Sequence, residues 1–173
     1  MTSVSGAGGH PAYSGGMPRI ATTDRVEREQ LLDFVRTRHH LVLLTTRADG
    51  RPQLSPVTGG VDTDGRIVIS TYPDRAKAVN LRRNPAASVL VLSDEWDDAW
   101  VQVDGTAEVL DMPSPEAEDG LVEYFRCISG EHPDWEEYRD AMRRQGKSLI
   151  RIEVASWGPV ATGGFPPDRA PAS

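Results

Sequence analysis

The sequence predicts a mainly β domain, in which short antiparallel strands close into a small barrel with a few helices around it. Two Asp-Gly pairs, Asp49-Gly50 and Asp64-Gly65, lie close together in the first half of the chain. Asp-Gly favours the tight turn of a β-hairpin, because glycine adopts positive φ at no steric cost. The apolar runs beside these turns are short and evenly spaced, which is typical of a small barrel.

The chain has 173 residues, enough for one domain with a substantial core. Its apolar fraction of 38% is low and fits a globular domain with disordered ends. We expect a disordered tail over residues 1–22, a cofactor-binding domain over 23–160 and an extended tail over 161–173. The first 16 residues are rich in Gly and Ser and lack the features of a signal peptide. Met17 is an alternative start.

The net charge of −7 and the pI of about 5.1 argue against nucleic acid or an anionic membrane as the main partner. No stretch approaches the roughly 18 apolar residues of a membrane span. Cys127 is the single cysteine, which excludes an internal disulfide and fits a reducing cytoplasm. It lies in an apolar helical run, so we interpret it as a buried small hydrophobe.

The first expected element is a helix that Thr22-Thr23-Asp24 caps and that runs to about Arg38. His39 and His40 then lie at its C-terminal end, where a capping contact is the default interpretation. No other histidine, cysteine or acidic residue stands at ligand spacing, so we expect no metal site. Alternating apolar patterns predict the strands that follow, at 41–47, 53–61, 67–72, 87–92 and 99–110.

The remaining elements are helical until the last strand. A short helix begins at Ala76 and ends at Asn84-Pro85, because proline stops the run. Residues 115–145 are expected to be helical with a break at 130–133. The closing strand, 147–154, alternates outward Arg151 and Glu153 with inward apolar residues.

The junction between the strand 67–72 and the helix at Ala76 is a candidate anion site. A helix start leaves backbone N–H groups unpaired and partly positive. Arg75 and Lys77 stand at this start, directly after the hydroxyls of Ser70 and Thr71. A guanidinium, an ammonium and two hydroxyls around helix amides suit a phosphate group. The alternative is that both cations are merely solvated.

The second strand contains Ser55, Pro56, Val57 and Thr58, followed by Gly59-Gly60. Proline cannot donate to a strand ladder, so Pro56 belongs at an edge or at an irregularity. The two glycines would let another backbone or a flat ligand come close. Free backbone groups in such a strand could bind the rim of a planar heterocycle. A bulge that only bends the barrel is an equally good interpretation.

Two tryptophans, Trp96 and Trp100, lie on and beside an acidic loop, 94–98. Its carboxylates lack the spacing of a calcium loop. Exposed aromatic residues of this kind often serve an interface or a ligand platform. The sequence has no nucleophile elbow, no Walker loop and no Cys-x-x-Cys pair. If the chain is an enzyme, a bound organic cofactor therefore carries the chemistry.

The order of these segments resembles a known family. The similarity runs from Ala48-Asp49-Gly50-Arg51 through Ser55-Pro56-Val57, then Ser70-Thr71 and Arg75-Ala76-Lys77, to Asn80-Leu81-Arg82-Arg83-Asn84-Pro85 and residues 101–109. It is to the pyridoxamine 5'-phosphate oxidase-like split barrels, and within them to the actinobacterial flavin/deazaflavin oxidoreductases that use coenzyme F420.

The resemblance implies a six-stranded antiparallel split β-barrel, a homodimer and cofactor sites between the subunits. In such proteins the positions of Arg75 and Lys77 bind the cofactor phosphate, Ser70 and Thr71 line the ribityl side, and Asn80 is close enough to help. The strand Ser55, Pro56, Val57, Thr58 lies along the ring. The partner subunit supplies further groups, for which Trp96, Trp100 and Gln102 are weaker candidates.

The hypothesis is an F420-dependent oxidoreductase that transfers a hydride between the deazaflavin and an unsaturated organic substrate, with no catalytic side chain assigned. The alternatives are an FMN-dependent enzyme on the same barrel and a non-catalytic carrier of either cofactor. Oxidation of pyridoxamine phosphate is disfavoured, because Trp157-Gly158-Pro159-Val160 has no basic cluster. A haem protein is disfavoured because we expect no histidine at a plausible ligand position on a barrel strand.

Overall fold

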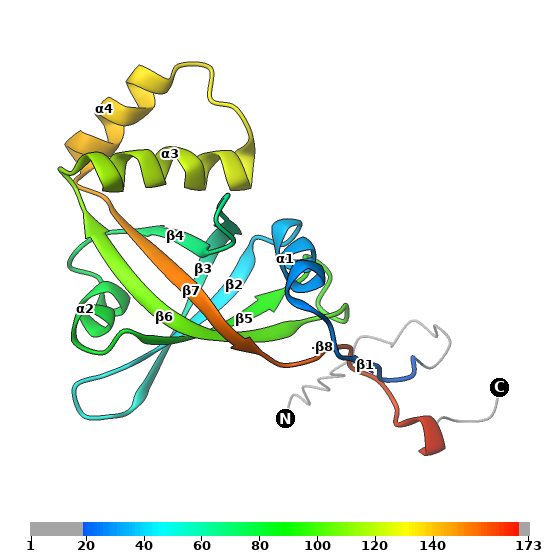
Figure 1. The fold of residues 1–173 in the computed structure, drawn as a ribbon. Helices are drawn as coiled ribbons and strands as arrows, with labels where there is room; N and C mark the ends of the chain where they lie inside the picture. The colour runs from blue at the N-terminus through cyan, green and yellow to red at the C-terminus, as the bar shows by residue number, and fades with distance from the viewer. Residues whose placement is uncertain (1–18, 170–173) are drawn as a thin grey trace, which may run out of the picture.

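The structure, a computed structural model, describes residues 19–169. Six antiparallel strands form a closed barrel in the order β2-β3-β4-β7-β6-β5 (Figure 1), which confirms the fold class that the sequence predicts. The strands are β2 (His40–Thr46), β3 (Pro52–Val61), β4 (Ile67–Thr71), β5 (Ala86–Leu92), β6 (Val101–Asp111) and β7 (Ser148–Trp157).

The two Asp-Gly turns form as predicted. Gly50 and Gly65 have φ values of +83° and +78°, in the region that favours glycine. The buried carboxylate of Asp62 fixes the second turn by accepting hydrogen bonds from the amides of Asp64 and Arg66, at 3.1 and 2.8 Å. These turns set the β2–β3 and β3–β4 pairings.

Alternating side chains fill the barrel. The inward positions of β2, β5 and β7 are fully or almost fully buried in one cluster: Leu41, Leu43, Val89, Val91, Ile150, Ile152 and Val154. The helices α3 (Pro115–Ser129) and α4 (Trp135–Gln145) pack a second cluster, with Leu121 and Tyr138, against the outer faces of β4 and β7. Ser114 caps α3 and Asp134 caps α4. Since α3 ends at Ser129 and α4 begins at Trp135, the predicted break between the two helices is confirmed.

The pairing of β3 with β4 is incomplete, and this opens one edge of the barrel. The two strands pair only from Gly59 opposite Ile69 to Val61 opposite Ile67. The rest of β3 pairs with β2 on one side only, without a register shift. Pro56 therefore lies on a free edge, as predicted, and the alternative of a bulge in this strand is not what the structure shows.

The helix α3 approaches β3 so closely at Gly60 that a side chain at this position would collide with it. A Cβ atom at Gly60 would lie 2.6 Å from the Cβ of Cys127, and the Cys127 thiol donates to the carbonyl oxygen of Val61 at 3.0 Å. Cys127 is half-buried, and burial raises the pKa of its thiol. This fits the interpretation as a small packed residue rather than a nucleophile.

We expect Gly60→Ala to lower the free energy of unfolding by about 1–3 kcal/mol, because the added methyl forces α3 away from β3. Urea unfolding followed by circular dichroism measures the change. Gly163→Ala is the matched control, since a Cβ there meets nothing within 4 Å. Equal stability of the two variants would contradict the close packing.

The first helix begins later than predicted. Thr23–Asp24 form β1, which pairs with β8 (Val160–Ala161), and α1 spans Arg28–Arg36. Glu27 caps α1, because its carboxylate and the side chain of Gln30 satisfy each other's backbone N–H groups. The prediction placed His40 at the helix end, whereas it is the first residue of β2. The strand expected at 99–110 spans 101–111.

The expected domain edges lie within a paired segment. The Ala21 amide donates to the carbonyl oxygen of Phe165 at 2.9 Å, and the Thr22 amide donates to the Thr162 hydroxyl at 3.0 Å. Residues 19–24 and 160–165 thus form one arm beside the barrel (Figure 1). The predicted disorder of the first residues and the alternative start at Met17 concern residues 1–18, which lie outside the described part. No helix within residues 19–169 is long and apolar enough to cross a membrane.

Candidate cofactor site

The helix α2 (Ala76–Arg83) follows β4 with four residues between them, and it begins at the residue that the sequence predicts. Arg75 occupies the N-cap position without a side-chain capping bond, and the first turn contains no acidic residue. The first helical bond runs from the Val79 amide to the Arg75 carbonyl oxygen at 3.0 Å. Within residues 19–169, the amides of residues 76–78 have no protein acceptor, so this helix start is free to bind an anion.

Arg75 and Lys77 take part in no ion pair within residues 19–169, whereas Arg82 on the same helix pairs with Asp111. Lys77 is half-buried, and this burial lowers the pKa of its ammonium; the nearby charge of Arg75 lowers it further. A bound phosphate would relieve both effects, because it replaces lost hydration and offsets the repulsion. The residues therefore fit an anionic group of a cofactor.

The next arginines on α2 have structural partners. Arg82 binds both carboxylate oxygens of Asp111, at 2.6 and 2.8 Å, and also the carbonyl oxygen of Pro73. Arg83 donates to the carbonyl oxygen of Thr46 at 2.6 Å. These contacts hold α2 against the barrel, and they give Arg82 and Arg83 protein partners that Arg75 and Lys77 lack within residues 19–169.

Lys147 is a third cation near this site, and sequence reasoning did not assign it. Its Nζ lies 3.9 Å from the ring centroid of Tyr72, and the guanidinium carbon of Arg75 lies 6.0 Å from the same centroid. The pairing of Thr71 with Ser148 brings Lys147 here. The two lysines of the chain thus belong to the same region, which a correct pairing of β4 with the closing strand would have predicted.

The structure brings two predicted segments to the place where β3 and β4 separate: residues 55–58, expected along the ring, and residues 70–71, expected on the ribityl side. If the β3–β4 register continued, Thr58 would lie opposite Ser70 and Val57 opposite Thr71, but these residues are unpaired with each other. Pro56 and Thr58 are exposed, whereas Ser55 and Thr71 are buried. The free edge of β3 thus stands beside the end of β4, which leads to α2.

Of the two roles considered for the glycines of β3, the structure shows the close approach of other segments of the chain. A Cβ atom on Gly59 would collide with the side chains of Leu41 and Ile69, and one on Gly60 with Cys127. The space that the glycines leave is therefore filled by the barrel core and by α3, not by a ligand.

Asn80 is part of the interior. Its side chain is 6% exposed. Its amide nitrogen donates to the Thr45 hydroxyl at 3.0 Å, and its amide oxygen accepts from Arg83 at 3.1 Å. Asn80 thus connects α2 to β2 through its hydrogen bond with Thr45, and any help that it gives to a cofactor is indirect.

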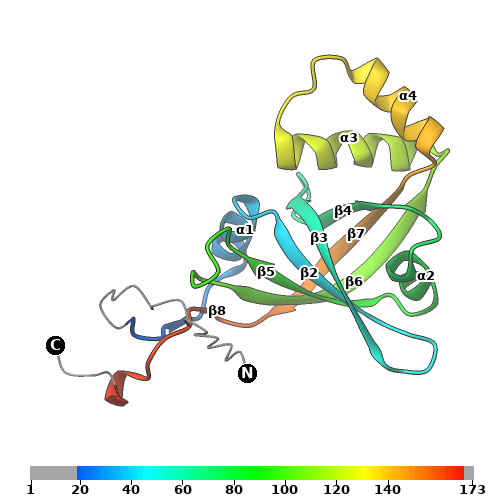
Figure 2. The same ribbon diagram turned by 180° about the vertical axis from the view of Figure 1, so that it is seen from behind.

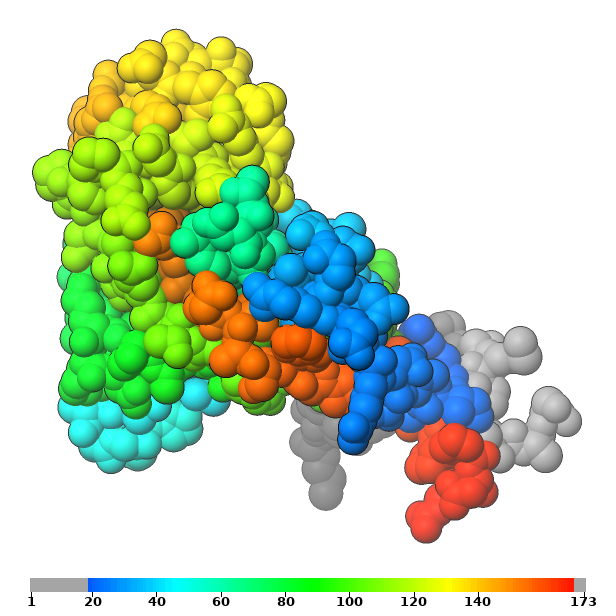
Figure 3. Space-filling model, in the orientation of Figure 1, coloured from blue at the N-terminus to red at the C-terminus, as the bar shows by residue number. Residues whose placement is uncertain are grey.

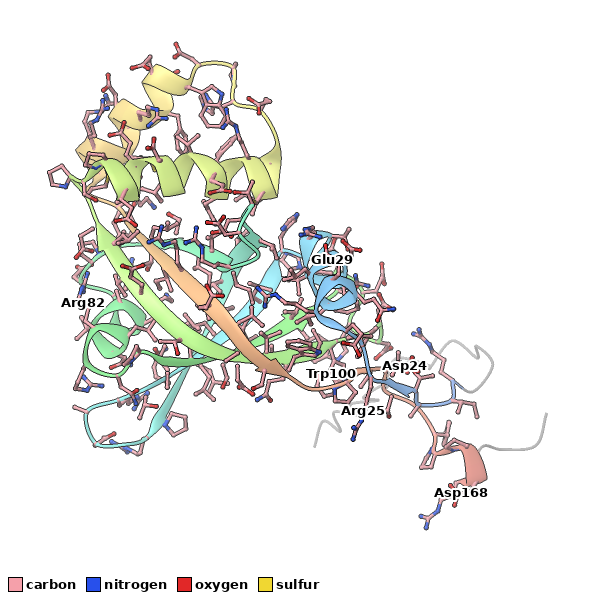
Figure 4. All side chains as sticks on the ribbon, in the orientation of Figure 1. Asp24, Arg25, Glu29, Arg82, Trp100 and Asp168 are labelled. Atoms are coloured by element: carbon pink, nitrogen blue, oxygen red, sulfur yellow. The ribbon has the colours of Figure 1, made fainter. Side chains whose placement is uncertain are left out.

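Trp96, Trp100 and Gln102 lie apart from the other predicted residues within one chain. Figure 4 places Arg82, which lies on α2, at one end of the barrel and Trp100 at the other, where the arm begins. Trp96 is 87% exposed and Trp100 is 39% exposed, while Gln102 donates to Asp104 at 3.1 Å. Only a second subunit could bring such residues to the α2 end of this one.

The histidines and acids form no metal site in the described part of the chain. His40 is the first residue of the barrel strand β2, and its Nδ1 is 3.0 Å from a carboxylate oxygen of Asp94. His39 Nδ1 is 2.9 Å from the carbonyl oxygen of Gly59. Each imidazole therefore has a protein partner at one nitrogen.

A hollow of about 740 Å³ lies elsewhere, where the turn between β3 and β4 stands between α1 and α3 (Figure 3). Its charged side chains have partners: Arg36 binds Glu29 and Asp33, Arg139 binds Glu118 and Asp119, and Glu123 accepts from Thr63. It lacks the unpaired positive charges found at α2, so the start of α2 fits an anionic group better than this hollow does.

The comparisons with known proteins agree with the fold. The family model described as pyridoxamine 5'-phosphate oxidase matches residues 28–161. The conserved hypothetical protein Rv2991 from Mycobacterium tuberculosis is 28% identical, with a TM-score of 0.66 over 80% of this chain and 89% of that one.

Two more distant structures share the fold. An F420 reductase is 19% identical, with a TM-score of 0.53 over 73% of this chain and 94% of that one. HutZ, the haem storage protein from Vibrio cholerae, is 20% identical, with a TM-score of 0.57 over 78% and 96%. Since the family model covers most of the sequence, this chain belongs to the pyridoxamine 5'-phosphate oxidase family.

Proposed function

We propose that the protein is an F420-dependent oxidoreductase that reduces an unsaturated organic substrate. The observation that carries this proposal is the pair of unbalanced cations, Arg75 and Lys77, at the free start of α2, directly beside the edge where β3 leaves β4. The likeness to an F420 reductase of the same fold supports this cofactor. FMN is the alternative, since the family as a whole supports a flavin.

Each part of the site has a separate task in this proposal. Arg75, Lys77 and the amides of α2 hold the phosphate, and Ser70 and Thr71 border the chain that joins the phosphate to the ring. The free edge of β3, from Ser55 to Thr58, holds the ring with backbone and hydroxyl groups. The reduced deazaflavin supplies the hydride. The protein contributes orientation, which by itself lowers a reaction barrier strongly, and solvent supplies the proton.

We also propose that two copies form the active unit. On the outer face of β2 and β5 the apolar side chains Val42, Leu44, Leu90 and Leu92 are half-buried, and Leu54 on β3 is 59% exposed. Cross-strand pairing makes this face continuous, since Val42 lies opposite both Pro56 and Leu90. Figure 2 shows no helix over this face, and contiguous apolar surface of this kind marks an interface.

A dimer through this face would complete the site. A two-fold axis parallel to β2 and β5 puts β6 of one protomer over β3 of the other, because β3 and β6 border the face on opposite sides. Trp100 and Gln102 of one copy would then approach Ser55–Thr58 of its partner. The single, half-buried Cys127 is compatible with a reducing compartment, so we infer that the enzyme acts in the cytoplasm.

The cofactor is tested by titrating the dialysed protein with F420 and, separately, with FMN. We expect a colourless protein that quenches F420 fluorescence to saturation, with inorganic phosphate as a competitor, because the phosphate is the main anchor. A yellow protein with a flavin spectrum would favour FMN. Tight F420 binding without oxidation of its reduced form by any quinone or enone would favour a carrier.

A further inference from the structure

Five polar side chains form a continuous hydrogen-bonded series from α2 through the barrel to β3. The series runs from Arg83 to Asn80 (3.1 Å), from Asn80 to Thr45 (3.0 Å), from Thr45 to Gln53 (3.2 Å) and from Gln53 to Ser55 (2.6 Å). Thr45 is fully buried, and Asn80 and Ser55 are 6% and 9% exposed. Buried polar groups in this number need a reason, because each costs free energy unless it is satisfied.

The direction of every bond in this series is fixed by its chemistry. A guanidinium only donates, so Asn80 must turn its oxygen to Arg83 and its NH₂ group to Thr45. The NH₂ group of Gln53 donates to the carbonyl oxygen of Leu54 at 2.8 Å, which leaves the Gln53 oxygen to accept from Thr45. All four bonds therefore point the same way, from the cation towards Ser55.

Ser55 ends the series as an acceptor, and its own proton remains unused. Its hydroxyl oxygen accepts from Gln53, and within residues 19–169 the Ser55 hydroxyl donates to no protein group. A hydroxyl that is nine-tenths buried and lacks an acceptor is a costly arrangement in the protein on its own. It becomes favourable when a ligand places an acceptor there.

We propose that the series from Arg83 to Gln53 fixes Ser55 as a hydrogen-bond donor to an acceptor atom of the bound cofactor ring, such as a ring carbonyl oxygen. This inference rests on the proposed function, because it places the ring along β3. Ser55 is the contacting residue, and Arg83, Asn80, Thr45 and Gln53 are positioning residues. Hydrogen bonds aligned head to tail from a cation polarise one another, so the Ser55 donor is stronger than an isolated serine.

A stronger donor discriminates between the two redox states of the ring. The reduced ring is richer in electrons, so its carbonyl oxygens accept hydrogen bonds better than those of the oxidised ring. The series should therefore favour the reduced cofactor and raise the reduction potential of the bound ring. Disruption at any of its bonds should reduce this preference, even where the altered residue does not touch the ring.

The test uses Ser55→Ala and Gln53→Glu in the full chain, with binding of oxidised and reduced F420 as readouts. We expect Ser55→Ala to raise the Kd of oxidised F420 by about 3- to 10-fold, the value of one hydrogen bond, and that of reduced F420 by more. Gln53→Glu should weaken binding further, because a carboxylate only accepts. The Ser55 hydroxyl would then donate its proton to this carboxylate, and its oxygen lone pairs would face the acceptor atom of the ring.

A double-mutant cycle separates this reversal from the added negative charge. In the Ser55→Ala background, Gln53→Glu should raise the Kd of F420 only slightly. If the added charge alone weakened binding, Gln53→Glu would raise the Kd as much in this background as in the wild type, and the proposal would be overturned. Thr45→Val should lose the preference for reduced F420, and Thr45→Ser should restore it. If Thr45→Val does not fold, the Gln53 cycle still decides.

The result also separates this inference from the proposed function. Wild-type affinity for both redox states in Ser55→Ala, in a protein that still needs Lys77 to bind F420, would overturn the role of Ser55 alone. Failure of the wild-type protein to bind F420 at all would instead overturn the proposed function.

Discussion

A protein that carries Arg75→Gln and Lys77→Met is expected to bind F420 at least about a hundredfold more weakly than the wild type. Each residue would donate a charge-assisted hydrogen bond to the phosphate, and such bonds contribute about 1.5–3 kcal/mol each. The two losses should therefore combine to about 3–6 kcal/mol. Fluorescence titration of F420 measures the effect, and phosphate should no longer compete.

The same double variant should not lose stability. Arg75 is exposed and has no ion pair in the part of the chain that the structure describes. The pKa of Lys77 is lowered in the folded protein, so its charge opposes folding below that pKa, and this penalty fades as the pH rises towards the ordinary lysine value. Removal of the charge removes the penalty, so thermal unfolding at neutral pH should occur at an unchanged or slightly higher temperature.

The matched control is Arg169→Gln, which removes a positive charge that is 80% exposed, next to Asp168 at the far end of the arm in Figure 4. It should leave F420 affinity unchanged. Arg82→Gln is a second control, which should change stability where the double variant does not. It removes the ion pair with Asp111 and should therefore lower the free energy of unfolding. If Arg169→Gln weakened binding as much as the double variant did, the cause would be net charge and not a phosphate site.

The barrel and the α2 junction were predictable because their signals are local. Asp-Gly pairs specify tight turns through the backbone conformation of single glycines, as Gly50 and Gly65 show. The change from alternating to helical spacing marks the start of α2, and the cations beside it need no knowledge of the fold. For Pro56 the local signal is weaker, because the missing N–H allows either a free edge or a bulge, and only the pairing of the strands decides for the edge.

Other parts of the site depend on contacts between distant segments. Lys147 reaches Tyr72 only because β7 pairs with β4, and spacing along the chain gives no sign of this. Asn80 was assigned to the cofactor from its distance along the chain to Lys77, whereas its contacts with Thr45 turn it inward. The start of α1 was misplaced because Glu27 and Gln30 cap it reciprocally, while Thr22, the stronger capping residue by type, binds Thr162.

The second large effect concerns association. We expect the wild-type protein to have twice the mass of the 18.9 kDa chain and Val42→Glu to have the mass of a single chain, measured by light scattering after size exclusion. Val42 is at the centre of the apolar face, opposite Pro56 on one side and Leu90 on the other. An unpaired charge buried in an interface costs several kcal/mol, and a two-fold axis places that charge in the interface twice.

Ala155→Glu adds the same charge to an exposed position of β7, three strands away from β2 in either direction around the barrel. It should remain dimeric, because β7 lies opposite the apolar face. If the site is completed by the partner's β6, the monomeric Val42→Glu protein should also bind F420 more weakly, although Arg75 and Lys77 are intact. A Val42→Glu protein that stays dimeric would show that the copies associate through another surface, and Trp96, Trp100 and Gln102 would then lose their proposed place beside the ring.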